Sequence, residues 1–326
     1  MTRQASLGID IGGSKTLFAL FDERFRVIED IKIKTHAEEG EKSFTRRFTE
    51  AVGKLVRAAR KKNFHLEAAG IGCTGTVNAT RDTMDKCPNV SFLVGYPLKD
   101  RLAKLTGANV FLMNDVHAGL YGEQQLGAAR GARHAIAVFI GTGIGGALMI
   151  DGKLHFGTSG CGGNIGNYLI HPLGVLSGSP RRGVLDDVAS RVAIAGDAAT
   201  LAARQWAPHL LEEVGTDVAE IRGQDLARVI EEGDEAVEEL VRSRARAVGL
   251  ALSNLVDFIN PDTIVLGGGL VEAMPKIIQE EVAAGIKQHA TRDTQKVLKV
   301  VATKLNGHAV TAGAAKFALD IFQNHG

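Results

Sequence analysis

One order of predicted elements occurs twice along the chain, and this repetition constrains the fold more than any single motif. The first copy, with a short helix and one more strand after it, has elements expected at 6–12, 16–22, 25–34, 41–62, 67–75, 97–107 and 109–115. The second copy restarts at His134 and has elements expected at 135–157, 185–258 (mostly helical), 262–270 and 296–305, before a closing helix at 309–323. Each copy begins with a strand hairpin and continues as strand, helix and strand. A chain of 326 residues with this pattern predicts an α/β protein of two related halves.

The composition excludes several classes of protein. Hydrophobic residues make up 45% and charged residues 23% of the chain, as in an ordinary soluble globular enzyme. The 38 basic and 37 acidic side chains leave a net charge of +1, so we expect no nucleic-acid partner and no membrane partner. The basic run at 57–63 is typical of the solvated end of a helix. The 39 glycines against 7 prolines favour tight turns and close approach of backbone to ligand.

The cysteines and the apolar runs indicate a reduced, cytoplasmic setting. The chain has 3 cysteines, Cys73, Cys87 and Cys161, and this odd, widely spaced set argues against a disulfide framework. The polar start at Met1–Ser6 leads us to expect no signal peptide. The longest apolar candidate, 135–150, is interrupted by glycines, so we expect no membrane helix.

The first glycine turn, Gly12–Lys15, follows an acid at the end of a buried strand. Gly12 and Gly13 let backbone N–H groups approach phosphate oxygens, while Ser14 and Lys15 add a hydroxyl and an ammonium donor. Asp10 can hold Mg²⁺ through water. An ordinary hairpin turn is the alternative interpretation, and the residues alone leave it open.

The second glycine turn, Gly141–Gly146, contains the spacing G-x-G-x-x-G, which suits a dinucleotide-binding fold. That fingerprint needs a helix directly after the glycines and an acid about 20 residues later. Here ALMIDGKLHF follows, which predicts strand and turn, and no Asp or Glu lies between Gly152 and Leu185. The context therefore indicates a strand hairpin instead of a dinucleotide site.

Two further segments have polar residues or glycines directly after predicted strands. Asn114 and Asp115 follow the strand NVFLM, where a carboxylate suits a general base and equally suits the N-cap of the next helix. The segment Asn260–Asp262 leads through a strand to Gly267–Gly269. This glycine turn is either part of a ligand site or a plain connection between strand and helix.

From Asp10 to Gly269, these segments taken in order resemble the sugar kinases of the ROK family (repressors, open reading frames, kinases). The family pattern Asp-x-Gly-Gly-Thr-Lys is matched at Asp10–Lys15 with Ser14 in place of threonine, and the similarity continues through GAAKFAL near the C-terminus. The resemblance implies the two-domain actin-like ATPase and sugar-kinase (ribonuclease H-like) α/β fold with an interdomain cleft. We expect an N-terminal α/β domain of residues 1–113 plus 309–326 and a larger C-terminal α/β domain of residues 114–308.

The resemblance also implies roles for individual residues. Asp115 corresponds to the catalytic base that accepts the proton of the acceptor hydroxyl. Substrate contacts are expected at Gly75, Thr76, Asn114, Asn164, Asn167 and Asp186. Nucleotide contacts are expected at Asp10, Gly12, Gly13, Ser14, Lys15, Thr142, Gly143, Gly267, Gly268 and Gly269. The implied cofactors are ATP and Mg²⁺, with the ion held by Asp10 and the nucleotide and with Thr142 and Gly143 near the β- and γ-phosphates.

The acceptor region departs from the family in residue type while it keeps the family's spacing. The family's Glu-x-Gly-His is here Asn164–Asn167, and its Cys-x-Cys-Gly-x-x-Gly-Cys-Leu-Glu overlays Ser177–Asp186 without a gap. The four positions of the family's zinc ligands hold Ser177, Ser179, Val184 and Asn167. These residues are not thiolates or imidazoles, so we expect no structural zinc. Amides that replace a carboxylate and an imidazole reduce negative charge and add hydrogen-bond donors.

We expect an ATP-dependent sugar kinase that transfers the γ-phosphoryl group to a hexose hydroxyl, with a glucose-like or altered acceptor. The alternatives are a catalytically idle sugar- or nucleotide-binding homologue and a polyphosphate-dependent sugar kinase. A repressor of the family would carry a helix-turn-helix segment, for which the first strand, near Ser6, leaves no room. The expected partners are a small sugar and a second copy of the chain in a homodimer. The residues do not separate glucose, fructose, mannose and acylated amino sugars.

Overall fold

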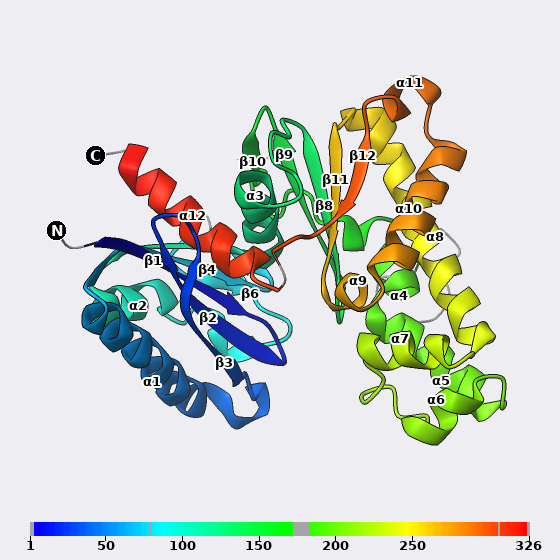
Figure 1. Ribbon diagram of the computed structural model, residues 1–326, viewed down its shortest axis with the longest axis horizontal. Helices are drawn as coiled ribbons and strands as arrows, with labels where there is room; N and C mark the ends of the chain where they lie inside the picture. Colours follow the sequence, from blue (N-terminus) through cyan, green and yellow to red (C-terminus); the bar gives the residue numbers. More distant parts are fainter. Residues whose placement is uncertain (1–2, 79, 172–182, 306, 325–326) are drawn as a thin grey trace. The chain divides into compact units, whose positions relative to one another are not determined.

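The computed structural model describes residues 3–78, 80–171, 183–305 and 307–324. The chain forms two compact units (Figure 1). Unit 1 consists of Met1–Gly131, Leu154–Gly162 and Lys304–Gly326, and unit 2 consists of Ala132–Lys153 and Gly163–Thr303. Within the described residues, no helix combines the length and the apolar character needed to span a membrane.

Unit 1 is built on a sheet with the strand order β3-β2-β1-β4-β7. Its strands are β1 (Arg3–Ile11), β2 (Lys15–Asp22), β3 (Val27–Lys34), β4 (Phe64–Cys73) and β7 (Asn109–Asn114), and a small hairpin pairs β5 (Thr76–Val77) with β6 (Met84–Lys86). Its α-helices are α1 (Gly40–Lys61), α2 (Leu98–Thr106), α3 (Asp115–Leu126) and α12 (Ala309–Asn324). The first three strands are antiparallel neighbours, and β4 and β7 join β1 in parallel.

Unit 2 carries the second sheet, with the order β10-β9-β8-β11-β12. The strands of this sheet are β8 (Ala135–Ile140), β9 (Ile144–Ile150), β10 (Lys153–His155), β11 (Thr263–Gly267) and β12 (Lys299–Ala302). Of these, Leu154 and His155 at the end of β10 belong to unit 1. Its α-helices are α4 (Leu185–Ala189), α5 (Arg191–Ala203), α6 (Pro208–Glu213), α7 (Gly223–Glu231), α8 (Glu235–Ile259), α9 (Gly269–Ala273), α10 (Pro275–His289) and α11 (Arg292–Gln295).

The two sheets share one topology. In each, a hairpin of antiparallel strands is extended by two strands that run parallel to the first strand of the hairpin. The duplication predicted from the sequence is therefore confirmed. The residues after Gly146 form β9, which confirms a strand where a dinucleotide fingerprint would require a helix.

The helix α1 illustrates how the sequence pattern builds the core of unit 1. Phe44, Phe48, Val52 and Leu55 recur at helical spacing, and all are buried. Phe48 meets Phe18 of β2 edge-on, with ring centroids 5.4 Å apart. The helix ends at Lys61, within the basic run, and Arg57, Arg60 and Lys61 are exposed, as predicted.

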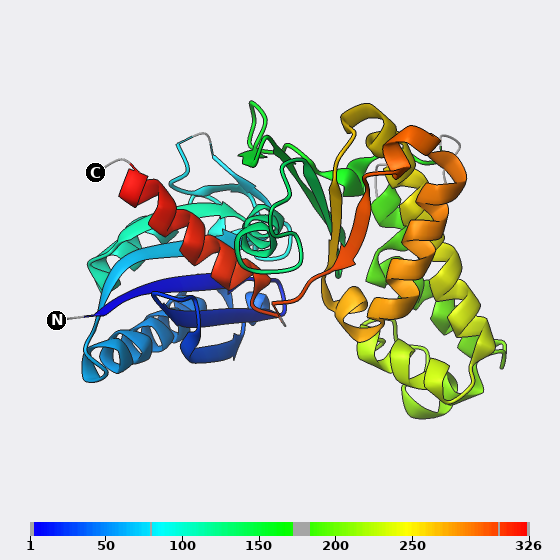
Figure 2. The ribbon, with the colours of Figure 1, turned by 45° about the horizontal axis from the view of Figure 1, so that its top comes forward.

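The C-terminal helix α12 lies directly on the backbone of the unit 1 sheet (Figures 1 and 2). Gly8 on β1 and Gly70 on β4 face it, and a Cβ atom on either would lie 1.9 Å from a carbonyl oxygen, that of Thr311 or Ala314 respectively. No side chain fits in this space, so the helix and the strands can approach each other only because both positions are glycine.

These compact units divide the chain differently from the expected boundaries at 113/114 and 308/309. Residues 114–131 and 304–308 lie in unit 1. The reason is packing, because α3 packs along α12, and buried Glu123 of α3 accepts hydrogen bonds from the N–H groups of Lys304 and Leu305 at 2.9 and 3.1 Å. A sequence pattern locates strands and helices but does not report such contacts between distant segments.

Gly70→Ala should lower the free energy of unfolding by about 1–3 kcal/mol, the usual effect of forcing an atom into a packed core. Gly196→Ala is the matched control, because Gly196 lies within α5 and a Cβ there meets nothing within 4 Å. The control should raise the free energy of unfolding by about 0.5–1 kcal/mol, because alanine loses less entropy in a helix. Chemical denaturation measures both, and equal stability of wild type and Gly70→Ala would contradict the contact.

Candidate functional site

The parallel strands of unit 1 end together, and their ends carry the predicted polar residues. Ile11 pairs with Cys73, and Cys73 pairs with Asn114 in the next strand. Asp10 therefore lies at the end of β1, Gly75 follows β4, and Asp115 follows β7 at the same edge of the sheet. This edge is where ligands bind in open α/β sheets.

Two hydrogen bonds to the backbone of Gly12 hold the turn between β1 and β2 in place. The N–H of Gly12 donates to the carbonyl of Lys15 at 3.0 Å, and the hydroxyl of Thr35 donates to the carbonyl of Gly12 at 2.7 Å. Ser14 and Lys15 are exposed. The turn is thus rigid in its backbone while its hydroxyl and ammonium groups face solvent.

Asn114 connects three parts of this edge through one amide group. Its Oδ1 caps α3 by accepting from the N–H groups of Val116 and His117, at 2.9 and 3.2 Å. Its Nδ2 donates to the carbonyl of Gly75 at 3.0 Å and to Oδ1 of Asp115 at 2.8 Å. The helix cap is therefore Asn114, and the sequence-based alternative of a cap at Asp115 is wrong.

Asp115 is the first residue of α3, and its carboxylate is poised to accept a proton. Burial raises its pKa above the usual value, although hydrogen bonds from the Val116 N–H and the Asn114 amide act in the opposite direction. A raised pKa makes the carboxylate a stronger base, and its hydrogen bonds fix its orientation.

Two buried thiols lie beneath this edge. Sγ of Cys73 and Sγ of Cys87 are 3.9 Å apart, and both cysteines are free. The hydrogen bond to Cys87, burial, and the negative charges of Asp115 and Asp10 raise the pKa of the Cys73 thiol. The Cys73 thiol therefore stays protonated in the presence of the Asp10 and Asp115 carboxylates.

In unit 2, the two glycine turns meet at one edge of the second sheet. Gly141–Gly143 connects β8 to β9, and β11 lies parallel to β8 with Gly267 paired to Phe139. Gly268 has a φ of 89°, and a Cβ there would lie 2.5 Å from the carbonyl oxygen of Ile140. Gly268 must therefore be glycine for the two turns to pack together.

Asp186 lies on the glycine hairpin of unit 2. It comes from α4, and its Oδ1 accepts a hydrogen bond from the N–H of Ile144. Burial and the charge of Asp187 raise the pKa of Asp186, against the effect of that hydrogen bond. The resemblance grouped Asp186 with the sugar contacts and did not predict its hydrogen bond to Ile144.

Asn164 and Asn167 flank one short 3-10 helix, Ile165–Asn167. Both residues are exposed, while Ile165 and Gly166 are buried. A Cβ on Gly166 would lie 2.0 Å from the carbonyl oxygen of Ile144, so this turn of helix packs on the start of β9. The two amides are thereby presented to solvent from a backbone fixed on the hairpin.

Hydrogen bonds hold the segments on either side of the undescribed stretch 172–182. The N–H groups of Ile170 and His171 donate to the carbonyl of Gly183 at 2.9 and 3.0 Å, and the N–H of Leu185 donates to the carbonyl of Tyr168 at 2.9 Å. Val184, at one of the family's zinc-ligand positions, is buried. Ser177 and Ser179 lie outside the described residues.

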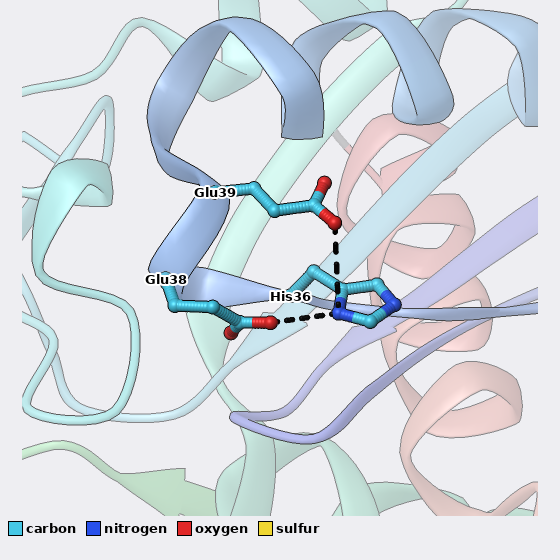
Figure 3. A group of neighbouring side chains, drawn as sticks. All are labelled: His36, Glu38 and Glu39. Atoms are coloured by element: carbon cyan, nitrogen blue, oxygen red, sulfur yellow. Dashed lines mark hydrogen bonds and ion pairs between the residues drawn. The ribbon is translucent and has the colours of Figure 1, made fainter.

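Within the described residues, His36, Glu38 and Glu39 form the group of side chains with a spacing that a metal ion could use (Figure 3). Nδ1 of His36 lies 2.8 Å from Oε1 of Glu38 and 3.8 Å from Oε1 of Glu39. Glu39 also accepts hydrogen bonds from Ser43 and Arg47. These side chains pair with each other at the 3-10 turn Ala37–Glu39, directly before α1.

The structure thus gathers the predicted site residues into two groups, one in each unit. The group in unit 1 consists of Asp10, Gly12, Gly13, Ser14, Lys15, Gly75, Thr76, Asn114 and Asp115. The group in unit 2 consists of Thr142, Gly143, Asn164, Asn167, Asp186, Gly267, Gly268 and Gly269.

Sheets of this shared topology, with glycine hairpins at the strand ends, define the actin-like ATPase and sugar-kinase class of α/β proteins. The chain belongs to the ROK family, which it matches over residues 6–321. It is similar to a glucokinase of Streptomyces coelicolor, with 27% identity over 96% of this chain and 97% of the relative. An N-acetylmannosamine kinase of Haemophilus influenzae is 27% identical over 84% of each chain.

The structure is also similar to a solved ROK family glucokinase from Streptomyces griseus, in complex with glucose and AMPPNP. The TM-score is 0.82 at 28% identity, over 97% of this chain and 99% of that one. Together these relatives support a sugar kinase.

Asp115→Asn should stabilise the protein more at neutral pH than in acid. The proton on Asp115 contributes stability that is present below the unfolded-state pKa and is lost as pH rises through the raised pKa of the folded state. Asparagine does not ionise, so the unfolding free energy of the variant minus that of wild type should increase from about pH 4 to pH 7.

Asp262→Asn is the control of opposite sign. Burial raises the pKa of Asp262, but hydrogen bonds from the His134 and Arg133 N–H groups and the Thr263 hydroxyl outweigh it and lower the pKa. Its stabilisation is present above the unfolded-state pKa and is lost as pH falls. The unfolding free energy of Asp262→Asn minus that of wild type should therefore decrease from acid to neutral pH. Chemical denaturation at several pH values measures this difference for both variants, and the same pH dependence in the two would refute the assignment.

Proposed function

We propose that this protein is an ATP- and Mg²⁺-dependent sugar kinase that transfers the γ-phosphoryl group to a hexose hydroxyl. Membership of the ROK family supports a sugar kinase, and the nucleotide, ion and acceptor are the proposed refinements. The observation that carries the proposal is the Asp115 carboxylate, which has a raised pKa and is fixed by Asn114 at the edge where β1, β4 and β7 end.

Asp115 accepts the proton of the acceptor hydroxyl and aligns its oxygen for attack. Phosphoryl transfer requires little covalent chemistry from a protein, so positioning and charge stabilisation dominate the rate. Asn114 contacts Asp115 and the carbonyl of Gly75, and Asn114, Gly75 and the adjoining Thr76 are proposed to bind the sugar. The half-buried setting of Asp115 limits water, which would otherwise compete as acceptor.

The residues at the glycine turns fit a nucleotide with its metal ion. Gly268 and Gly143 let the turns of unit 2 pack closely, because a Cβ there would lie 2.5 Å from the Ile140 carbonyl oxygen or 2.9 Å from Oδ1 of Asp186, and Lys15 of unit 1 offers a cation. Asp10, an oxygen donor, suits Mg²⁺ through water. Bound Mg²⁺–ATP supplies the phosphoryl group and neutralises the charge that develops on it.

The acceptor site is proposed to favour a sugar that accepts hydrogen bonds. Asn164 and Asn167 are exposed amides that both donate and accept, and Asp186 is engaged by the N–H of Ile144. The relatives include a protein named glucokinase and one named N-acetylmannosamine kinase. Glucose and an N-acylated amino sugar are therefore the first acceptors to compare.

A panel of sugars with Mg²⁺ and either ATP or polyphosphate tests the proposal. ADP release that depends on one sugar supports it and identifies the acceptor. Turnover with polyphosphate and none with ATP would establish the alternative donor. Sugar binding by calorimetry without turnover from either donor would refute the kinase and establish a sugar-binding homologue, an alternative motivated by the amides at Asn164 and Asn167.

Asp115→Asn should lower kcat by about 10²–10⁴-fold, the usual contribution of a positioned base. The exchange keeps size and hydrogen bonding but removes the proton acceptor, so nucleotide affinity should stay unchanged. Asp320→Asn on α12 is a control of the same chemistry and should turn over like wild type. Normal turnover by Asp115→Asn would exclude its role as base.

Purified protein should contain no stoichiometric zinc. The four positions of the family's zinc ligands hold Ser177, Ser179, Val184 and Asn167, which do not fit the ion. Metal analysis after dialysis measures the content, and a zinc-selective chelator should leave turnover unchanged. One tightly held zinc ion per chain, or activity abolished by the chelator, would contradict this prediction.

A further inference from the structure

His117 lies in the first turn of α3, two residues after Asp115, and is only 2% exposed. Its Nδ1 lies 3.2 Å from Oδ1 of Asn114. Asn114 in turn donates to Asp115, so the imidazole contacts the proposed base through one intervening amide.

The hydrogen bonds of Asn114 fix which end of its amide faces the ring of His117. Oδ1 of Asn114 accepts from the N–H groups of Val116 and His117, and Nδ2 donates to the carbonyl of Gly75. A flipped amide would direct its N–H groups at those backbone N–H groups and its oxygen at that carbonyl. Asn114 therefore presents oxygen to the ring, which favours the tautomer of His117 that carries its proton on Nδ1 and can donate to that oxygen.

The surroundings keep the ring neutral. His117 stacks on Phe156 with centroids 4.9 Å apart, and the Arg81 guanidinium lies 3.8 Å from the centroid of Phe156. Burial, then the positive charges of Arg81 and His155, lower the pKa of His117 to about 4, although the carbonyl groups of His155 and Gly162 act in the opposite direction. Asp115, the nearby acid, is separated from the ring by the Asn114 amide.

We infer that His117 is a positioning residue, which locks the Asn114 amide so that Asn114 holds the Asp115 carboxylate in the orientation that accepts the substrate proton. The inference rests on the proposed function. Oδ1 of Asn114 accepts from the backbone N–H groups of Val116 and His117, and the ring N–H adds a side-chain donor to the same atom. Without the ring N–H, the amide keeps its backbone bonds but loses a third donor to Oδ1, so it holds Asp115 less firmly through the bond that lowers the pKa of Asp115.

Three variants separate positioning from packing. His117→Leu removes the donor and should lower kcat about 10- to 100-fold, the scale of a small misplacement at a reacting centre, with little change in KM for ATP. His117→Asn retains an N–H near the position of Nδ1 and should restore most of kcat. Tyr121→Phe removes the 2.6 Å hydrogen bond to Asp320 one turn further along α3 and should leave kcat unchanged.

The pH profile adds a readout that lost packing alone would not change. Activity falls in acid as Asp115 becomes protonated, and this limb should move to higher pH in His117→Leu but not in Tyr121→Phe. An unshifted limb, or equal losses of kcat in the leucine and asparagine variants, would overturn the inference.

Nitrogen NMR of the full-length wild-type protein decides the inference even where no turnover is found. The ring of His117 should be neutral and protonated at Nδ1 from about pH 5 to pH 8. The side-chain amide signals of Asn114 should shift in His117→Leu and not in Tyr121→Phe. A proton on Nε2, or an Asn114 amide that does not respond, would overturn the inference whatever the sugar panel reveals about the proposed function.

Discussion

The direct contact between the C-terminal helix and the backbone of the unit 1 sheet is the constraint on which the candidate site depends. Gly8 and Gly70 admit α12, and Gly313 of α12 admits α3 just as closely, because a Cβ there would lie 1.8 Å from the carbonyl oxygen of Ala118. The strand ends and the start of α3 are thereby held by one helix. Asn114 and Asp115 take their positions from this backbone packing, and side-chain bonds refine their orientation.

Much of the fold could be predicted because periodicity is a local property of the sequence. The apolar spacing in α1, the glycine turn at 12–15 and the strand after Gly146 all follow from neighbouring residues. Several features of the site could not be predicted. The hydrogen bond between Asp186 and Ile144 joins residues 42 positions apart. The cap at Asn114 depends on the Gly75 carbonyl, and the place of 114–131 in unit 1 depends on α12. Each of these is a tertiary contact without a local signature.

The chain keeps the family's glycine turns while it changes the side chains at positions that are proposed to meet the acceptor. Glycines remain at 143 and 268, where the Asp186 carboxylate and the Ile140 backbone approach closely. In contrast, Asn164 and Asn167 replace charged or metal-binding residue types, and Val184 is buried where a thiolate would bind zinc. Backbone hydrogen bonds between 168–171 and 183–185 join the segments that a metal ion would otherwise connect.

The short 3-10 helix at Ile165–Asn167 has an evolutionary consequence. Its inward residues, Ile165 and Gly166, belong to the packing of unit 2, while Asn164 and Asn167 face solvent. Exchanges at the two outward positions change donors, acceptors and charge without creating a cavity, so selection on stability does not oppose them. The proposed acceptor contacts at these two positions can therefore change in evolution while the packing that carries the proposed base stays the same.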